Sequence, residues 1–462
     1  MKRHIAIVFY IFLAYPAFAL AEQSPLQQWV GHYAGTGGFD DLGQKIATDS
    51  SGNVYVTGQS MGISSYDIMT VKYNTSGIQQ WSARYDGPNH ALDNPAAITV
   101  DNSGNVLVTG KTYYSSKGHF ATIKYSPDGN QLWTAYYGGA ETTDTANAIA
   151  VDSSGNIYIT GTSKQQATGN DIATIKYSPD GNQLWVSLYN YGSWDSAAAI
   201  VLDSSNNVYV TGGVGASANR DYGTVKYNSN GVQQWAVRYN GPGVGDDLAF
   251  AIAVDSSGNV YVGGESVGTG GTGFDYATVK YNSSGAQQWA SRYSGSGNKS
   301  DIIYGLALDT SSNIYVTGES NEVGTGRDFT TIKYNSSGTQ QWVAHYDGPV
   351  SSIDTARSIA VDGYGSAYVT GTSTGTGYYD YATVKYSTSG TQLWAMRYNG
   401  SVNYLDYGAA LSLRGTYVYV TGYATEHHTY KDYVTIKYDL DGNQQWQVNF
   451  DGQAHLDDTP YD

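Results

Sequence analysis

The sequence predicts an all-β protein folded as one β-propeller of four-stranded antiparallel blades, with eight blades. Three observations lead to this fold class. The chain contains 44 Tyr and 57 Gly but only 9 Pro, which favours many short strands joined by tight turns. A unit of about 52 residues repeats along the chain. Each unit reads as four short strands bounded by turn residues.

The repeat is most easily followed by its tryptophan. This residue recurs every 50 to 54 positions, so that eight full units fill the chain. The tryptophans of the series are Trp29, Trp81, Trp133, Trp185, Trp235, Trp289, Trp342, Trp394 and Trp446.

The unit that ends near Trp133 shows where the strands lie. We expect its strands, named a to d in order, at residues 96–100, 106–109, 120–125 and 131–137. The turn Asp101-Asn-Ser-Gly-Asn105 joins a to b. Four strands per repeat favour a propeller over a solenoid of stacked hairpins, whose repeats are usually shorter.

Two segments carry a family resemblance. Residues 252–262, Ile-Ala-Val-Asp-Ser-Ser-Gly-Asn-Val-Tyr-Val, and residues 275–281, Asp-Tyr-Ala-Thr-Val-Lys-Tyr, resemble the bacterial SBBP β-propeller repeat family. The resemblance covers nearly all of the chain after residue 21. It implies a propeller and an exported or surface protein, and it implies no particular reaction because the family has no common catalytic site. The family's name supposes seven blades, whereas eight units are countable here.

A second resemblance is local. Gly77-Ile-Gln-Gln-Trp81 and its copies are similar to the tryptophan-docking repeats of pyrroloquinoline-quinone dehydrogenases. That similarity implies that each tryptophan packs between adjacent blades. It brings no quinone-site residues with it, so it concerns architecture alone.

The beginning of the chain has the features of a secretory signal. Lys2 and Arg3 precede a short apolar stretch at residues 5–15, and Ala19-Leu-Ala21 forms a small-residue cleavage site. We therefore expect a signal peptide at residues 1–21 and one propeller domain at residues 22–462. The protein would be exported to the periplasm, the cell surface or the medium. The absence of Cys excludes disulfides.

The two ends leave the closure of the ring open. Residues 26–29 supply a d-type strand before the first unit, and residues 444–446 supply another after the last, so one d strand is surplus. Propellers close by pairing a strand from one terminus into the blade made by the other, and either strand would serve. The tail Asp458-Thr-Pro-Tyr-Asp462 resembles the start of a ninth copy.

The loops divide the ring into two unlike faces. The a–b and c–d turns recur with little change, whereas the b–c and d–a loops on the other face, here called the variable face, differ among the repeats. We predict that this face binds a protein or a glycan through exposed rings. The alternative is that the rings pack onto their own loops. The candidates are Tyr113, Tyr114, Trp194, Tyr378, Tyr379, Tyr404, His427, His428 and Tyr430.

An Asp precedes each a strand. Its structural interpretation is a carboxylate that accepts backbone N–H groups and fixes the loop. Its functional interpretation is a ring of carboxylates around one mouth of the channel, which would attract cations such as Ca²⁺. We favour the first and expect no cofactor, with Ca²⁺ as the one candidate. These residues are Asp41, Asp93, Asp144, Asp195, Asp247, Asp301, Asp354 and Asp406.

Two further charged residues recur in strand c. A second Asp, for example Asp328, opens this strand in seven units, and we expect it to cap the strand end. A Lys recurs in all eight units. If residues 335–338 form the c–d turn, Lys333 faces Gln340 and Trp342 lies diagonally beside it, which predicts a Lys–Trp cation–π contact.

No catalytic motif identifies the protein as an enzyme. The chain has no Cys nucleophile, and His427-His428 lacks the spacing of a helical zinc motif. The formal charge of −16 argues against a nucleic-acid partner. Our leading hypothesis is an exported, monomeric binding or scaffold propeller. The alternatives are a glycan hydrolase or lyase on the variable face and a purely structural surface protein.

Overall fold

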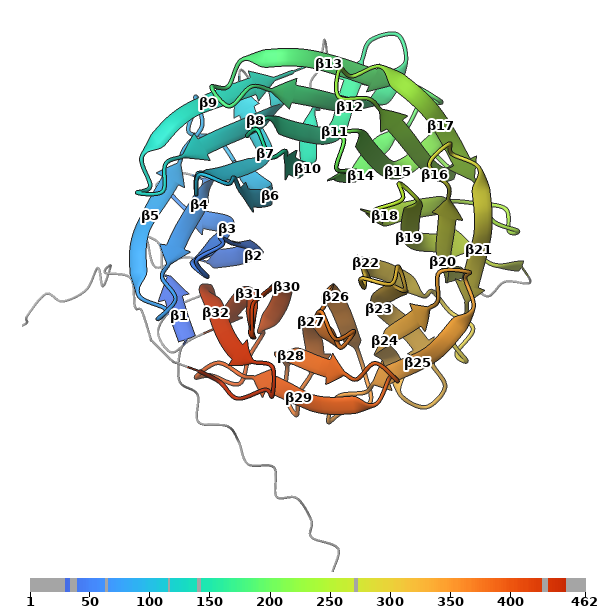
Figure 1. Ribbon diagram of the computed structural model, residues 1–462. Coiled ribbons are helices and arrows are strands. Elements are labelled where there is room, and N and C mark those ends of the chain that lie inside the picture. Colours follow the sequence, from blue (N-terminus) through green and yellow to red (C-terminus); the bar gives the residue numbers. More distant parts are fainter. Residues whose placement is uncertain are drawn as a thin grey trace, which may run out of the picture.

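The fold is a ring of eight blades (Figure 1). The computed structural model describes residues 30–33, 40–62, 65–114, 117–138, 143–269, 273–425 and 431–445. Each blade is a four-stranded antiparallel sheet whose first strand lies at the central opening and whose last strand lies at the rim. The predicted fold class and the eight blades are confirmed. The described residues include no helix that could cross a membrane.

The strands follow chain order in every blade except the eighth. Blade 1 consists of β2 (Asp41–Thr48), β3 (Val54–Met61), β4 (Tyr66–Tyr73) and β5 (Gln79–Tyr85), and blade 2 of β6 (Asn94–Val100), β7 (Val106–Tyr114), β8 (Lys117–Tyr125) and β9 (Gln131–Tyr137). Blade 3 consists of β10 (Thr145–Val151), β11 (Ile157–Gln165), β12 (Gly169–Tyr177) and β13 (Gln183–Tyr189), and blade 4 of β14 (Ser196–Leu202), β15 (Val208–Ala216), β16 (Asn219–Tyr227) and β17 (Gln233–Tyr239).

The second half of the ring repeats the pattern. Blade 5 consists of β18 (Asp247–Val254), β19 (Val260–Val267), β20 (Phe274–Tyr281) and β21 (Gln287–Tyr293), and blade 6 of β22 (Ile302–Leu308), β23 (Ile314–Glu322), β24 (Gly326–Tyr334) and β25 (Gln340–Tyr346). Blade 7 consists of β26 (Asp354–Val361), β27 (Ala367–Thr374), β28 (Tyr379–Tyr386) and β29 (Gln392–Tyr398), and blade 8 of β30 (Tyr407–Arg414), β31 (Tyr417–Thr425), β32 (Lys431–Asp439) and β1 (Val30–Tyr33).

The first d strand closes the ring. β1 pairs antiparallel with β32, from Val30 opposite Ile436 to Tyr33 opposite Tyr433. This pairing decides the question that the sequence left open. At the other end, Gln444 forms an isolated bridge to Tyr438. The signal segment, Trp446 and the tail that resembles a ninth copy lie outside the described residues.

Strand b of blade 1 begins with three apolar residues, which are buried because the blade is covered by a neighbour on each side. In β3, Val54 and Val56 pack in a cluster with Tyr419 of blade 8, whereas Tyr55 packs with Val106 of blade 2. All five side chains are buried. Burial of a side chain of this size contributes roughly 1.5–3 kcal/mol, and the same strand recurs in every blade.

The recurring a–b turn is organised by its Asp. In blade 3, Asp152 Oδ1 accepts hydrogen bonds from the backbone N–H groups of Ser154 and Asn156, at 3.0 and 2.9 Å. Its Oδ2 accepts from Asn156 Nδ2 at 2.8 Å and from the Tyr158 hydroxyl at 3.0 Å. Burial raises the pKa of Asp152, but these hydrogen bonds outweigh it and hold the pKa below its usual value. One carboxylate therefore explains why Asp, Asn and Tyr recur together.

The tryptophans pack between blades, as predicted. The centroid of the Trp81 ring lies 6.2 Å from that of Tyr55 in its own blade and 6.0 Å from that of Tyr125 in the next. Trp81 Nε1 donates to the carbonyl oxygen of Pro127 at 2.9 Å. Gly129 lies against this ring with φ +86°, and a Cβ there would come within 2.7 Å of it. The recurring Gly of the c–d turn thus makes room for the tryptophan of the preceding blade.

The predicted Lys–Trp cation–π contact is wrong. A register shift between Lys333 and Tyr334 places Lys333 directly opposite Trp342, not diagonal to it. The Lys333 ammonium instead lies 4.8 Å from the ring centroid of Tyr315 in strand b. Lys333 Nζ and Trp342 Nε1 donate to the same carbonyl oxygen, that of Thr388 in the next blade, at 3.5 and 3.0 Å. The lysine is therefore a contact between blades.

Glu265 in β19 is a buried carboxylate with a pH-dependent effect on stability. Burial raises its pKa to about 7; Arg220 opposes the shift, and Asp246 and Glu319 add to it. Because the folded-state pKa exceeds the unfolded-state pKa, Glu265 contributes stability at low pH that is lost as the pH rises through about 7.

We therefore expect the Glu265→Gln variant to gain Tm relative to the wild type between pH 5 and pH 8, by a few degrees. Thermal unfolding across this pH range measures the effect. Glu322→Gln is the matched control, because hydrogen bonds lower the pKa of Glu322 although burial opposes them, and it should show no such gain. A difference between Glu265→Gln and the wild type that does not change with pH would contradict the assignment.

Candidate functional site

The predicted ligand residues lie at three separate places on the variable face. These places are the end of β7, the loop before β14, and the loops next to β28 and β30. The end of β7 holds Tyr113 and Tyr114, and the loop before β14 holds Trp194. The loops next to β28 and β30 hold Tyr378, Tyr379 and Tyr404. The remaining candidates, His427, His428 and Tyr430, lie outside the described residues.

Two tyrosines form an open aromatic pair between blades 7 and 8. The ring centroids of Tyr378 and Tyr404 lie 4.6 Å apart, and the residues are 45% and 44% exposed. Tyr379 instead packs against Tyr407, with centroids 5.5 Å apart. Of the three candidates here, two present their rings to solvent and one packs on its neighbour.

The tyrosines of blade 2 have partners within their own hairpin. The Lys111 ammonium lies 4.6 Å from the ring centroid of Tyr113. Tyr114 is exposed and contacts the edge of His119 at a centroid distance of 6.0 Å. Tyr114 is 52% exposed, so this place also presents a ring to solvent.

Trp194 is held by the backbone on both sides of its loop. Its N–H donates to the carbonyl oxygen of Gly215 in β15 at 2.9 Å, and the N–H of Asn170 donates to the carbonyl oxygen of Ser193 at 3.2 Å. A Cβ at Gly169 would lie 2.5 Å from that Ser193 oxygen, so the close approach requires glycine. The indole remains 46% exposed. A fixed loop therefore presents a large ring to solvent.

Trp194 borders a cleft of about 580 Å³. Asn147 Nδ2 donates to the carbonyl oxygen of Ala197 at 2.6 Å, and the hydroxyls of Thr162 and Ser196 are 2.6 Å apart. The described lining offers amide, hydroxyl and ammonium groups beside the indole, and none of these residues is Asp, Glu or His. The cleft is lined by Thr143, Thr145, Asn147, Thr162, Lys164, Gly169, Asn170, Ser193, Trp194 and Ser196.

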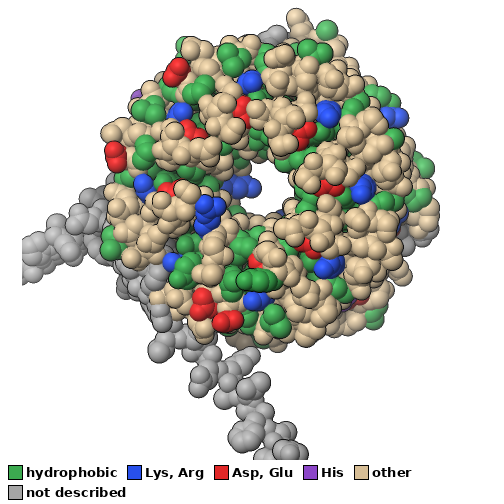
Figure 2. Space-filling view, viewed as in Figure 1, with side chains coloured by type: hydrophobic (Ala, Val, Ile, Leu, Met, Phe, Trp, Pro, Cys, Tyr) green, Lys and Arg blue, Asp and Glu red, His purple; other side chains and the backbone are tan. Residues whose placement is uncertain are grey.

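The eight Asp residues before the a strands are shielded from the central opening, which Figure 2 shows in space-filling form. Asp301 is typical: its Oδ2 accepts from the N–H of Gly295 and its Oδ1 from the N–H of Asn321, both at 2.7 Å. Burial raises the pKa of Asp301 to about 6. The carboxylate ties the d–a loop to the end of strand b. All eight are at most 1% exposed: Asp41, Asp93, Asp144, Asp195, Asp247, Asp301, Asp354 and Asp406.

The second Asp series forms ion pairs that the sequence analysis missed. In four blades, the Asp at the start of strand c pairs with an Arg of strand d. The pairs are Asp67–Arg84 at 2.9 Å, Asp221–Arg238 at 2.5 Å, Asp275–Arg292 at 2.8 Å and Asp380–Arg397 at 2.7 Å. The Asp and the Arg of each pair are always 17 residues apart, and this constant spacing could have predicted the pairs from the sequence.

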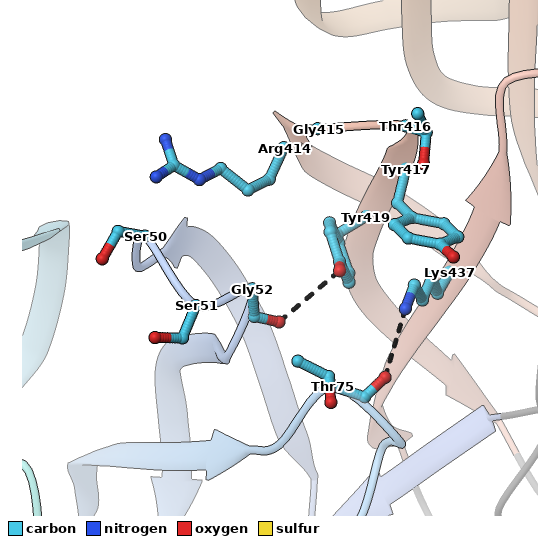
Figure 3. A pocket seen from close by; sticks show the side chains of 10 residues that line it. All are labelled: Ser50, Ser51, Gly52, Thr75, Arg414, Gly415, Thr416, Tyr417, Tyr419 and Lys437. Atoms are coloured by element: carbon cyan, nitrogen blue, oxygen red, sulfur yellow. Dashed lines mark hydrogen bonds between the residues drawn. The ribbon is translucent and has the colours of Figure 1, made fainter.

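A second cleft, also of about 580 Å³, lies on the opposite face at the seam between blades 8 and 1 (Figure 3). Blade 8 has the short turn Arg414-Gly415 where the other blades have an Asp-containing turn. Lys437 Nζ lies 3.7 Å from the ring centroid of Tyr417 and donates to the carbonyl oxygen of Thr75 at 3.1 Å. Burial lowers the pKa of Lys437 to about 8. The cleft thus results from a shortened turn.

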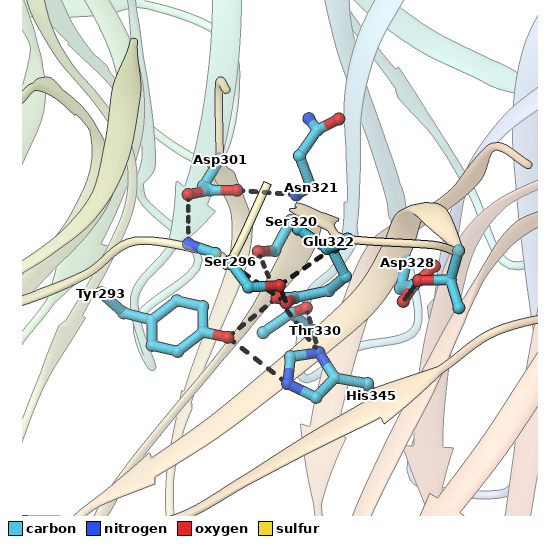
Figure 4. A network of polar contacts seen from close by, with 12 residues as sticks. Tyr293, Ser296, Asp301, Ser320, Asn321, Glu322, Asp328, Thr330 and His345 are labelled. Atoms are coloured by element: carbon cyan, nitrogen blue, oxygen red, sulfur yellow. Dashed lines mark hydrogen bonds and ion pairs between the residues drawn. The ribbon is translucent and has the colours of Figure 1, made fainter. Parts of the chain in front are cut away.

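A polar network joins blades 5 and 6 on the variable face (Figure 4). The Tyr293 hydroxyl donates to Glu322 Oε1 at 3.0 Å, and Ser296 Oγ donates to Glu322 Oε2 at 2.5 Å. His345 Nδ1 lies 3.0 Å from Thr330 Oγ1. Glu322 is bonded on both oxygens, so the network fixes loops.

Comparison with a protein-family model confirms the repeat type. Five segments match the β-propeller repeat family SBBP: residues 31–63, 80–113, 132–165, 288–323 and 348–379.

A curated relative is viral. An uncharacterized WD repeat-containing protein of Acanthamoeba polyphaga mimivirus is 25% identical over 443 residues, which cover 78% of this chain and 31% of that protein. The chain therefore spans about a third of the length of this relative.

Solved propellers share the fold. Sqt1 of Chaetomium thermophilum superimposes with a TM-score of 0.56 at 11% identity, covering 88% of this chain and 98% of Sqt1. A second Sqt1 structure, bound to the N-terminus of a ribosomal protein, gives a TM-score of 0.55 at 11% identity and covers 88% of this chain and 99% of that one. At this identity the likeness concerns the fold alone.

Proposed function

We propose that this protein is an exported binding propeller whose variable face holds a glycan in the cleft of Trp194. The observation that carries the proposal is the 46% exposed indole, fixed by its loop, beside a cleft of amide and hydroxyl groups. Flat rings stack on the apolar faces of sugars, while amides and hydroxyls bond the sugar hydroxyls. Export rests on the signal-like features of the first residues.

The cleft supports binding over hydrolysis. Glycoside hydrolysis needs a pair of carboxyl groups at the scissile bond. The described lining supplies Lys164, Asn147 and Asn170 but no carboxylate. The ammonium of Lys164 favours a sugar that carries an acidic group.

We expect the Trp194→Ala variant to bind its glycan at least about tenfold more weakly than the wild type, because loss of a central aromatic anchor typically costs 2 kcal/mol or more. A glycan array on residues 22–462 identifies the ligand, and calorimetry then measures the affinity. The matched control is Tyr364→Ala, which removes an exposed ring, 84% exposed, from the a–b turn of blade 7 on the opposite face.

Two results would contradict this proposal. One is a glycan whose affinity is unchanged in Trp194→Ala, which would place its site elsewhere. The other is a blank array, which would favour a protein partner at the open pair Tyr378 and Tyr404. If a glycan is found, analysis of the mixture after prolonged incubation tests for turnover, and cleavage products would favour the hydrolase or lyase alternative.

A further inference from the structure

We infer that Asp328, Asp347 and Asp354, on the variable face between blades 6 and 7, bind one Ca²⁺ ion. One carboxylate oxygen of each residue lies within 4.8 Å of the corresponding oxygens of the other two. Oxygen ligands stand about 2.3–2.6 Å from Ca²⁺, so two ligands of one ion are at most about 5 Å apart. The spacing fits one shared ion.

Two buried oxygens of this cluster, one on Asp328 and one on Asp347, lack a donor, whereas both oxygens of Asp354 accept backbone N–H groups at 2.9 Å. Asp328 is 2% exposed; its Oδ2 accepts from Thr325 Oγ1 at 2.7 Å, but its Oδ1 is buried without a hydrogen-bond partner. The Oδ1 of Asp347 is likewise buried and without a partner. An ionised oxygen buried in this way costs free energy unless a cation meets it. A cation bound by this cluster would supply the positive charge that these two carboxylates need.

Blade 3 shows one way in which this place is satisfied. In blade 3 the residue that corresponds to Asp347 is Asn190, whose Nδ2 donates to Asp171 Oδ1 at 2.8 Å. Asp347 has no proton to donate, so the substitution both removes a hydrogen bond and adds a negative charge. Blade 6 therefore needs a positive charge where blade 3 uses an amide.

Blade 6 has also lost the cation that other blades supply. Blade 1 has a similar cluster, Asp67, Asp86 and Asp93, but Arg84 Nη1 lies 2.9 Å from Asp67. In blade 6 the place of Arg84 is taken by His345. Figure 4 shows His345 turned towards Tyr293 and Glu322, with Asp328 to one side. The cluster of blade 6 thus has three carboxylates and no arginine.

The chemistry of the donors selects the ion. Three carboxylates and no sulfur or nitrogen ligand suit a hard divalent cation. The donors come from β24, the following d–a loop and β26, and water would complete the shell, which suits the variable coordination of Ca²⁺ better than the strict octahedron of Mg²⁺. Asp347 is partly exposed and provides the entry path. The ion would brace the loops of blades 6 and 7.

The test is calorimetric titration of EDTA-treated residues 22–462 with CaCl2 and, separately, with MgCl2. We expect about one Ca²⁺ per chain, weaker binding of Mg²⁺, and a Tm that rises by several degrees in 5 mM CaCl2. Asp347→Asn restores the amide found in blade 3, so it should remain folded, lose the Tm response and bind Ca²⁺ at least tenfold more weakly. Asp86→Asn in blade 1 is the matched control and should keep the wild-type response.

A second variant tests the charge argument directly. His345→Arg places a guanidinium where Arg84 stands in blade 1 and should also abolish the Ca²⁺ response. The proposal is overturned if the wild type neither releases heat nor gains Tm with CaCl2, if Asp347→Asn keeps the full response, or if Asp86→Asn loses as much as Asp347→Asn does. Tighter binding of Mg²⁺ than of Ca²⁺ would overturn the choice of ion.

Discussion

A protein that begins at residue 40, and so lacks β1, should melt about 10 °C or more below the protein that begins at Glu22, and should aggregate on heating. β1 supplies the outer strand of blade 8 and pairs with β32 along its whole length. Its removal leaves the backbone edge of β32 open and removes the hydrogen-bonded strand that ties the start of the chain to blade 8. Circular dichroism and light scattering during a thermal ramp measure both effects.

The control for this truncation is a protein that begins at residue 26, which keeps Trp29 and β1 and should melt with the protein that begins at Glu22. A synthetic peptide of residues 22–39, added in trans, should restore part of the Tm. An unchanged Tm without β1 would mean that the surplus d-type strand near Gln444 replaces it. In that case a protein that begins at residue 40 and ends at residue 440, and so lacks both d-type strands, should show the lower Tm.

The sequence was sufficient to predict the architecture. The tryptophan period gave the number of blades because each repeat places one indole between two sheets, as Trp81 does between Tyr55 and Tyr125. The Asp-x-x-Gly-Asn turns were predictable because their hydrogen bonds are local, within six residues. Features that each repeat builds from its own neighbours in sequence were visible before the structure.

Features that depend on register were not predictable. The bulge between Lys333 and Tyr334 shifts the pairing of strands c and d and places Lys333 directly opposite Trp342, while the ammonium of Lys333 lies over Tyr315 in strand b. The closing strand was equally undetermined, because residues 26–29 and 444–446 carry the same pattern. Only the pairing of β1 with β32 distinguishes them.

The candidate site was predictable in part. Trp194, Tyr378 and Tyr404 were recognised because their loops depart from the repeat, and the structure places them exposed on the variable face. The polar lining around Trp194 was missed because Asn147 and Lys164 come from other strands of the ring. Asp347 was missed although blades 3, 4 and 7 have Asn at its position, since a single charge change has meaning only beside Asp328 and Asp354.

The last prediction concerns the a–b turn. Asp152→Ala should lower the free energy of unfolding by about 3 kcal/mol, because it removes hydrogen bonds to a charged acceptor and leaves the buried Tyr158 hydroxyl without a partner. Urea denaturation at pH 7 measures the loss. Ser153→Ala, at an exposed position of the same turn, is the control and should stay within about 0.5 kcal/mol of the wild type.

The pH dependence of this loss identifies its cause. The pKa of Asp152 is lower in the folded protein than in the unfolded chain, so its charge contributes stability that is fully present above about pH 4 and is lost as the pH falls through the folded-state value. The difference between Asp152→Ala and the wild type should therefore narrow below pH 4. At pH 7 the free energy of unfolding of Asp152→Asn should lie between those of the wild type and Asp152→Ala. An amide keeps one acceptor oxygen but presents a donor to Asn156 or Tyr158. A difference that stays constant from pH 7 to pH 3 would assign the loss to packing, not to the carboxylate charge.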